Sequence, residues 1–174
     1  MKANKIDILH ENVLRRLVEY YEDQNIPAVI KGDEGEVETM YLALFDMGLD
    51  EEETLGECAF LPMLEDDTVQ NFACMITITE DLSKDNLGTL FAAISQLNYY
   101  LAYGSFGTLP SDGRLVYKFT VPMDINLDEN QLYNQTLLVT ETAITMVNTY
   151  VDIIMNIANG KATIADLADR LGLA

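Results

Sequence analysis

The 174-residue chain has no tryptophan, one histidine, two cysteines and only ten lysine and arginine residues, against 29 aspartate and glutamate residues. The resulting formal net charge of −19 disfavours binding to nucleic acid or to an anionic membrane surface, because both are negatively charged themselves. Since 49% of the residues are hydrophobic, the chain can bury a core, which excludes disorder as a global description. The length suits one domain, so we expect a single domain over residues 1–174.

The scarcity of histidine and cysteine limits the chemistry as well. Catalytic triads and most zinc sites need histidine beside other convergent groups, and the polar pattern around His10 predicts a surface side chain. Cys58 and Cys74 match no metal-binding or redox spacing, and we expect buried free thiols in strands. The sequence has no glycine-rich phosphate loop and no dinucleotide motif. We therefore expect no enzymatic activity and no cofactor.

One stretch resembles a calcium-binding loop, with Asp124, Asn126 and Asp128 at the first, third and fifth positions. The sixth position should be glycine but is Glu129, and the twelfth should be a bidentate glutamate but is Gln135. Asn126 followed three residues later by Glu129 is instead a variant of the capping box. We expect these residues to cap the following helix and to bind no metal.

The hydrophobic pattern predicts an α+β fold, because apolar residues recur every three or four positions in some segments and alternate in others. Consecutive strands with short polar turns favour an antiparallel β-sheet of about five strands, with helices packed mainly on one face, in the order α-β-β-β-α-β-β-α. The expected helices cover 6–23, a segment from the N-cap Ser83 to Gly104, 127–159 and, briefly, 164–171; the expected strands cover 36–47, 55–64, 71–79, 106–109 and 114–121, with 28–31 as a further option.

Two segments bear on the cellular compartment. The uncharged run from Leu87 to Ser111 is interrupted by polar residues and glycines, so we expect a buried helix and no membrane span. The N-terminus starts with lysines, but charged residues between Asp7 and Arg16 interrupt the apolar run that a signal peptide needs. Together with the free thiols, this pattern predicts a cytoplasmic protein.

Acidic residues concentrate between Gly32 and Ser83, where there are 15 of them and no lysine or arginine. Most lie in expected turns between strands, where solvated carboxylates keep a sheet soluble. Two alternatives remain: recognition of a basic protein partner, and a hard-metal or acid–base site. The residues expected to contact a partner are Asp50, Glu51, Glu52, Glu53, Glu65, Asp66 and Asp67.

The expected long helix has two adjacent apolar stripes, and its remaining face is mostly threonine and asparagine. A helix on one side of a sheet needs an apolar stripe of roughly 100°. The surplus predicts a homodimer, although other helices of the same chain are an alternative cover. The interface residues expected on this helix are Val147, Tyr150, Val151 and Ile154.

The stretch from Leu97 to Leu109, where a helix ends in an asparagine-containing segment and passes directly into a strand, resembles the YbjN-like family. The strand-like stretch from Asp112 to Lys118 and a C-terminal helix then follow, as in that family. Its members share the fold of type III secretion chaperones and are described as regulators of sensory transduction. The resemblance implies a small, acidic, cytoplasmic bacterial protein without catalytic residues. The chain departs from the family by its long, nearly uncharged final helix and the short helix after Gly160.

These observations predict a non-enzymatic protein-binding module, an adaptor or chaperone-like regulator with a protein partner. Two alternatives stay open: a carboxylate- and metal-dependent enzyme, and an acidic mimic of nucleic acid that binds a basic protein.

Overall fold

The computed structural model describes residues 3–32, 37–44, 54–63, 68–83, 85–109 and 113–173. Its elements confirm the α+β class and the predicted order, with a strand at 28–31 and the short last helix included. In chain order they are α1 (Ala3–Asp23), β1 (Ala28–Lys31), β2 (Thr39–Leu44), β3 (Thr54–Phe60), β4 (Val69–Thr79), α2 (Leu87–Tyr100), β5 (Ser105–Leu109), β6 (Arg114–Asp124), α3 (Glu129–Ala158) and α4 (Ile164–Arg170).

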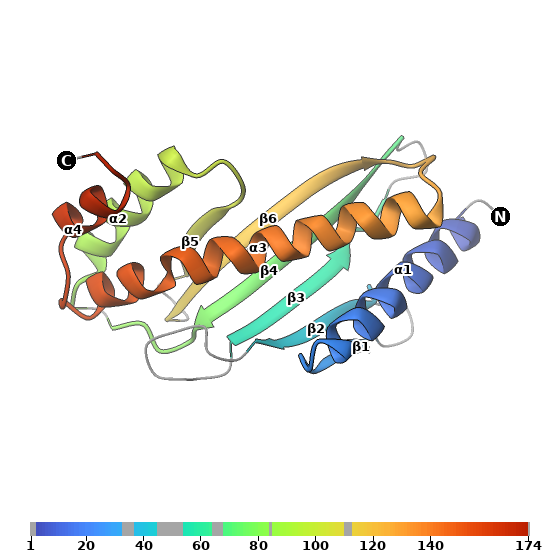
Figure 1. Ribbon diagram of the computed structural model, residues 1–174, viewed down its shortest axis with the longest axis horizontal. Coiled ribbons are helices and arrows are strands. Elements are labelled where there is room, and N and C mark those ends of the chain that lie inside the picture. Colours follow the sequence, from blue (N-terminus) through green and yellow to red (C-terminus); the bar gives the residue numbers. More distant parts are fainter. Residues whose placement is uncertain are drawn as a thin grey trace.

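The strands form one antiparallel sheet in the order β1-β2-β3-β4-β6-β5. The described part of the sheet thus has six strands, where the sequence predicted about five, because β1 pairs with β2 at one edge. Figure 1 shows α3 crossing the sheet, α1 beside it on the same side, and α2 and α4 gathered at one end. The predicted packing of helices mainly on one face is confirmed.

The core lies between the sheet and these helices, because alternate strand residues face the helices. Cys58 and Cys74 lie directly opposite each other in β3 and β4, and both are buried free thiols, as the sequence predicts. The hydrogen bond between the two thiols, followed by burial, raises the pKa of Cys74 well above its usual value. A thiol held in this way is a packing group of low reactivity.

Helix α3 supplies ten buried residues to the core. It is also the one helix in the described ranges that is long and apolar enough to cross a membrane by length and composition, a test that core helices of folded proteins also pass. Here it packs on β4 and β6 and against α1 and α2.

Three predicted helix ends are wrong by a few residues. Helix α2 begins after Asn86, while the Ser83 hydroxyl accepts a hydrogen bond from the Asp85 amide in a local turn. The helix ends at Tyr100, before Gly104. At the start of α3, the capping box is formed by Asp128 and Gln131, and not by Asn126 and Glu129.

Candidate functional site

The seven acidic residues predicted to contact a partner lie outside the described residues. They are Asp50, Glu51, Glu52, Glu53, Glu65, Asp66 and Asp67. Their role therefore stays a prediction.

The structure does describe the four residues of α3 predicted to form a dimer interface. Val147, Val151 and Ile154 are buried within a single chain, at 0%, 2% and 0% exposure, and Tyr150 is half-buried. Helix α3 packs on β4 and β6 and against other helices of the same chain. The interface predicted for these three residues is wrong, because a second copy cannot reach them.

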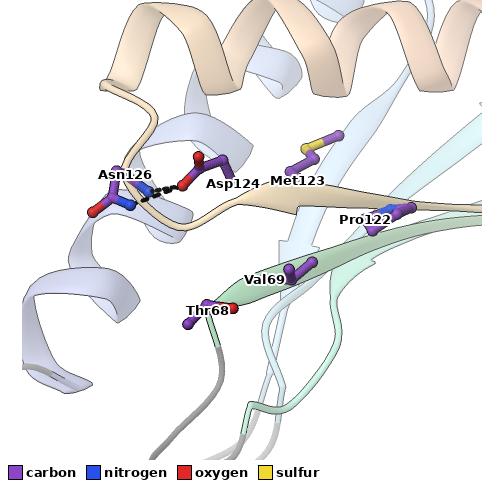
Figure 2. Close-up of a pocket in the computed structure, with 6 residues that line it drawn as sticks. All are labelled: Thr68, Val69, Pro122, Met123, Asp124 and Asn126. Carbon is purple, nitrogen blue, oxygen red and sulfur yellow. Dashed lines mark hydrogen bonds between the residues drawn. The ribbon is translucent and has the colours of Figure 1, made fainter.

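A shallow pocket of about 370 Å³ lies at the ends of β4 and β6, as Figure 2 shows. Its lining residues are Thr68, Val69, Pro122, Met123, Asp124 and Asn126. The Asp124 Oδ1 already accepts hydrogen bonds from the Asn126 backbone amide (2.8 Å) and from Asn126 Nδ2 (2.9 Å). Asp124 has the one carboxylate among these lining residues, and its hydrogen bonds to Asn126 stabilise the turn.

Two residues of the stretch that resembles a calcium-binding loop make hydrogen bonds to the backbone before and at the start of α3. Asp124 holds the turn through Asn126, and Asp128 caps α3 by accepting a hydrogen bond from the Gln131 amide at 2.9 Å. Across the described ranges, no group of three histidine, cysteine, aspartate or glutamate side chains could hold a metal ion.

His10 was predicted to be a surface side chain, and the structure corrects this. Its ring stacks on Phe60, and its Nε2 lies 2.5 Å from Gln70 Oε1. The Gln70 amide nitrogen donates to the Asp124 carbonyl, which leaves Oε1 as the acceptor and makes His10 Nε2 the donor. Burial lowers the pKa of His10, against smaller opposing effects of Gln70 and Asp7. A local polar pattern hid this contact, because its partners lie 50 or more residues away in the chain.

The sheet also has a face that is turned away from α1 and α3, which we call the open face. Its side chains alternate with those buried under the helices, and several large apolar ones are about 40% exposed. The more prominent members are Val29, Tyr41, Leu55, Glu57, Met75, Val116 and Lys118.

A third surface, around α2 and the turn that follows it, exposes aromatic side chains. We call Phe91, Tyr99, Tyr100 and Tyr103 the α2 aromatic surface; Tyr99 is 81% exposed and Tyr103 is 54% exposed. No charged residue occurs from Leu87 to Leu109, although the chain carries a net charge of −19.

Hydrogen bonds to the backbone fix the shape of this surface. The Asn98 side chain donates to the Phe106 carbonyl and accepts from the Phe106 amide, both at 2.9 Å, which ties α2 to β5. The Tyr117 hydroxyl donates to the Tyr103 carbonyl at 2.8 Å. Tyr99 and Tyr100 at the end of α2 and Tyr103 in the following turn are therefore on a backbone that these hydrogen bonds support. Asn98 is the asparagine of the stretch that resembles the YbjN-like family.

The chain was compared with protein families, curated proteins and solved structures. No protein-family model and no curated protein matches the chain. The crystal structure of YbjN from E. coli is similar to 84% of this chain and 93% of that chain, with 15% sequence identity and a TM-score of 0.45. The likeness concerns the fold alone.

Proposed function

We propose that the protein is a non-enzymatic protein-binding module, an adaptor or chaperone-like regulator, and that the α2 aromatic surface binds its protein partner. The observation that carries the proposal is the exposure of Tyr99, Tyr100 and Tyr103 in a stretch of the sequence without charge. Interface cores are enriched in tyrosine and depleted of charged residues. Tyrosine also offers a large apolar ring and a hydroxyl that hydrogen-bonds a partner.

The surroundings of these tyrosines support a binding role. Tyr99 and Tyr100 pack edge to face with ring centroids 5.0 Å apart, and Tyr103 lies 5.8 Å from Phe119. Rings held against one another and against a fixed backbone lose little conformational freedom when a partner covers them. The side chains needed for binding are thus arranged before the partner arrives.

The partner's charge is a separate part of the proposal. The 15 acidic residues between Gly32 and Ser83 favour a basic protein, and a cytoplasmic location suits the two free thiols. A basic partner that contacts these carboxylates should bind more weakly as salt screens them.

The binding role is tested by affinity capture from the source cell with mass spectrometry. The variant Tyr99→Ser/Tyr100→Ser removes two exposed rings of the surface, and Leu138→Ser removes a side chain that is 67% exposed on α3 and serves as the matched control. We expect a protein that wild type and control retain and the tyrosine variant loses. Equal retention by all three would exclude the α2 aromatic surface.

The competing role of a metal-dependent enzyme is tested by calorimetric titration with calcium, magnesium, manganese and zinc. We expect no tight stoichiometric binding. A stoichiometric site of micromolar affinity or better would favour the enzyme and count against the binding module.

A further inference from the structure

The open face has a regular pattern that the register of the strands defines. Glu57 on β3 and Lys118 on β6 lie in one row across the sheet, and Met75 on β4 stands between them. The next row in the same face contains Leu55, Thr77 and Val116 in the corresponding strands. In each row the residue of β4 therefore lies between one residue of β3 and one residue of β6.

This pattern is complementary to itself. A two-fold axis that runs parallel to β4, between two sheets stacked face to face, places β3 of one copy over β6 of the other and β4 over β4. Glu57 then faces Lys118 of the partner subunit, and the same pair forms a second time by symmetry. Leu55 faces Val116 of the partner subunit, so apolar residues meet apolar residues in the neighbouring row.

We propose that the open face is a homodimer interface, in which two sheets pack face to face and Glu57 of each copy pairs with Lys118 of the other. The proposal goes beyond the binding role given above, because it uses a different surface of the molecule. Two sheets packed in this way lie about 10 Å apart with strands within about 30° of parallel.

The distribution of charge favours a second copy as the occupant. By strand alternation, the strand residues of the open face include Lys31, Arg114 and Lys118 against Glu57 and Asp124, a formal charge of +1 for these described strands on a chain of −19. Two copies of so acidic a chain repel each other through most pairs of surfaces. Where open face meets open face, the strands bring little net charge together, and the axis sets Glu57 of each copy against Lys118 of the other.

The two kinds of contact have different roles. The exposed apolar side chains of the central strands, with Leu55, Leu61 and Val69 each at 36–41% exposure, supply the affinity, because burying them removes apolar area from water. The Glu57–Lys118 pairs supply orientation, because buried ion pairs add little net affinity but penalise an arrangement that juxtaposes like charges.

The interface is tested by sedimentation equilibrium at micromolar concentration and moderate salt. We expect wild type at twice the chain mass of 19.5 kDa. In a dimer of Glu57→Lys chains, the new lysine of each copy faces Lys118 of the other copy. In a dimer of Lys118→Glu chains, the new glutamate of each copy faces Glu57 of the other copy. Each should raise the dissociation constant on the order of 100-fold, because like charges in an interface cost several kcal/mol. Asp152→Lys makes the same charge change as Glu57→Lys but at an exposed position of α3, and it should leave the dimer intact.

Mixing gives the sharpest result. Glu57→Lys chains and Lys118→Glu chains, each monomeric alone, should form a heterodimer, because both pairs then regain opposite charges; the variant that carries both substitutions in one chain should be a homodimer. Circular dichroism checks that every variant is folded. A monomeric wild type, a dimer that both single variants leave intact, or folded single variants that fail to associate when mixed would each overturn the proposal.

Discussion

The imidazole of His10 lies flat on the ring of Phe60, with the ring centroids 3.8 Å apart and the planes 6° apart. The contact joins α1 to β3, and the hydrogen bond from His10 to Gln70 extends it to β4. Gln70 is 1% exposed and donates onward to the Asp124 carbonyl at 3.0 Å. The single histidine of the chain thus links the first helix to the centre of the sheet and to the turn before α3.

Replacing this histidine should destabilise the fold. His10→Ala removes the stacked ring and leaves the buried Gln70 oxygen without its donor, at a cost of about 2 kcal/mol in the free energy of unfolding. Urea unfolding at pH 7.5 measures the change. A loss within 0.5 kcal/mol of zero, typical of an exposed site, would contradict the structural role.

The same site makes stability depend on pH. Burial lowers the pKa of His10 in the folded chain, whereas in the unfolded chain it titrates near 6.5. The unfolded state then binds the proton more readily, so the stabilisation from neutral His10 is complete above about pH 6.5 and declines as the pH falls. Asp7, one turn earlier on α1, opposes the shift but does not reverse it.

The control is His10→Phe, which keeps a ring on Phe60 but cannot titrate. Between pH 7.5 and pH 5.5, wild type should lose more stability than this variant, and the comparison cancels the effect of protonating the carboxylates of the acidic chain. Parallel pH profiles for the two proteins would show that the histidine does not titrate differently in the two states.

A second prediction concerns Gly104, which has φ +61. A Cβ added there would overlap the Tyr117 hydroxyl and lie 2.8 Å from the Lys118 carbonyl oxygen. Gly104→Ala should therefore cost about 3 kcal/mol, through overlap and a left-handed backbone together.

Substitutions at two other glycines distinguish the effect of steric overlap from the effect of the left-handed backbone. Gly172 has φ +70 but open space around it, so Gly172→Ala should cost only about 1 kcal/mol. Gly107 lacks both constraints, and Gly107→Ala should change stability by less than about 0.5 kcal/mol. Thermal unfolding of the three variants measures the order of their losses in stability. An equal loss of stability for Gly104→Ala and Gly172→Ala would show that overlap with Tyr117 adds nothing.

A third prediction concerns the start of α3. Asp128→Ala removes the side chain that accepts from the Gln131 amide and should cost about 1 kcal/mol. Glu129→Ala, the partner in the box predicted from the sequence, should not disturb the cap but loses its 3.2 Å ion pair with Arg16, worth less than about 1 kcal/mol for exposed groups. A larger loss at Glu129 than at Asp128 would contradict the observed cap.

The parts of the fold that the sequence predicts are those that depend on neighbouring residues. The helices and strands follow from apolar periodicity over ten or so positions, and the buried thiols follow from strand alternation. Helix ends were wrong where two good capping residues stand close together, as Asn126 and Asp128 do, because local chemistry does not rank them.

The surfaces were harder to predict, because they depend on which distant segments meet. The sequence predicted that a second copy covers the apolar stripe of α3 that contains Val147 and Val151, yet both side chains are buried within a single chain. His10 has a polar local setting, and only the folded chain brings Phe60 and Gln70 to it. The row that contains Glu57 and Lys118 could not be predicted without the strand order, because β4 lies between the strands of the two residues.

The proposed dimer makes one more prediction, on salt. Each copy has a net charge of −19, and their mutual repulsion reaches about 30 Å at 0.01 M ionic strength but about 8 Å at 0.15 M. The Glu57–Lys118 pairs, buried between the sheets, are screened much less than exposed charges. Raising the salt should therefore tighten the dimer, in contrast to a complex with a basic partner, which should weaken. Sedimentation equilibrium at the two salt concentrations gives the two dissociation constants.

The variant with both Glu57→Lys and Lys118→Glu is the control for this effect. It has the same net charge as wild type and the same pairs with their signs exchanged, so its dimer should tighten with salt to the same extent. A wild-type dimer that weakens as salt rises would mean that exposed ion pairs hold the copies together. Such a result would exclude the open face as the interface, because the affinity there comes from apolar side chains, and salt does not weaken their burial.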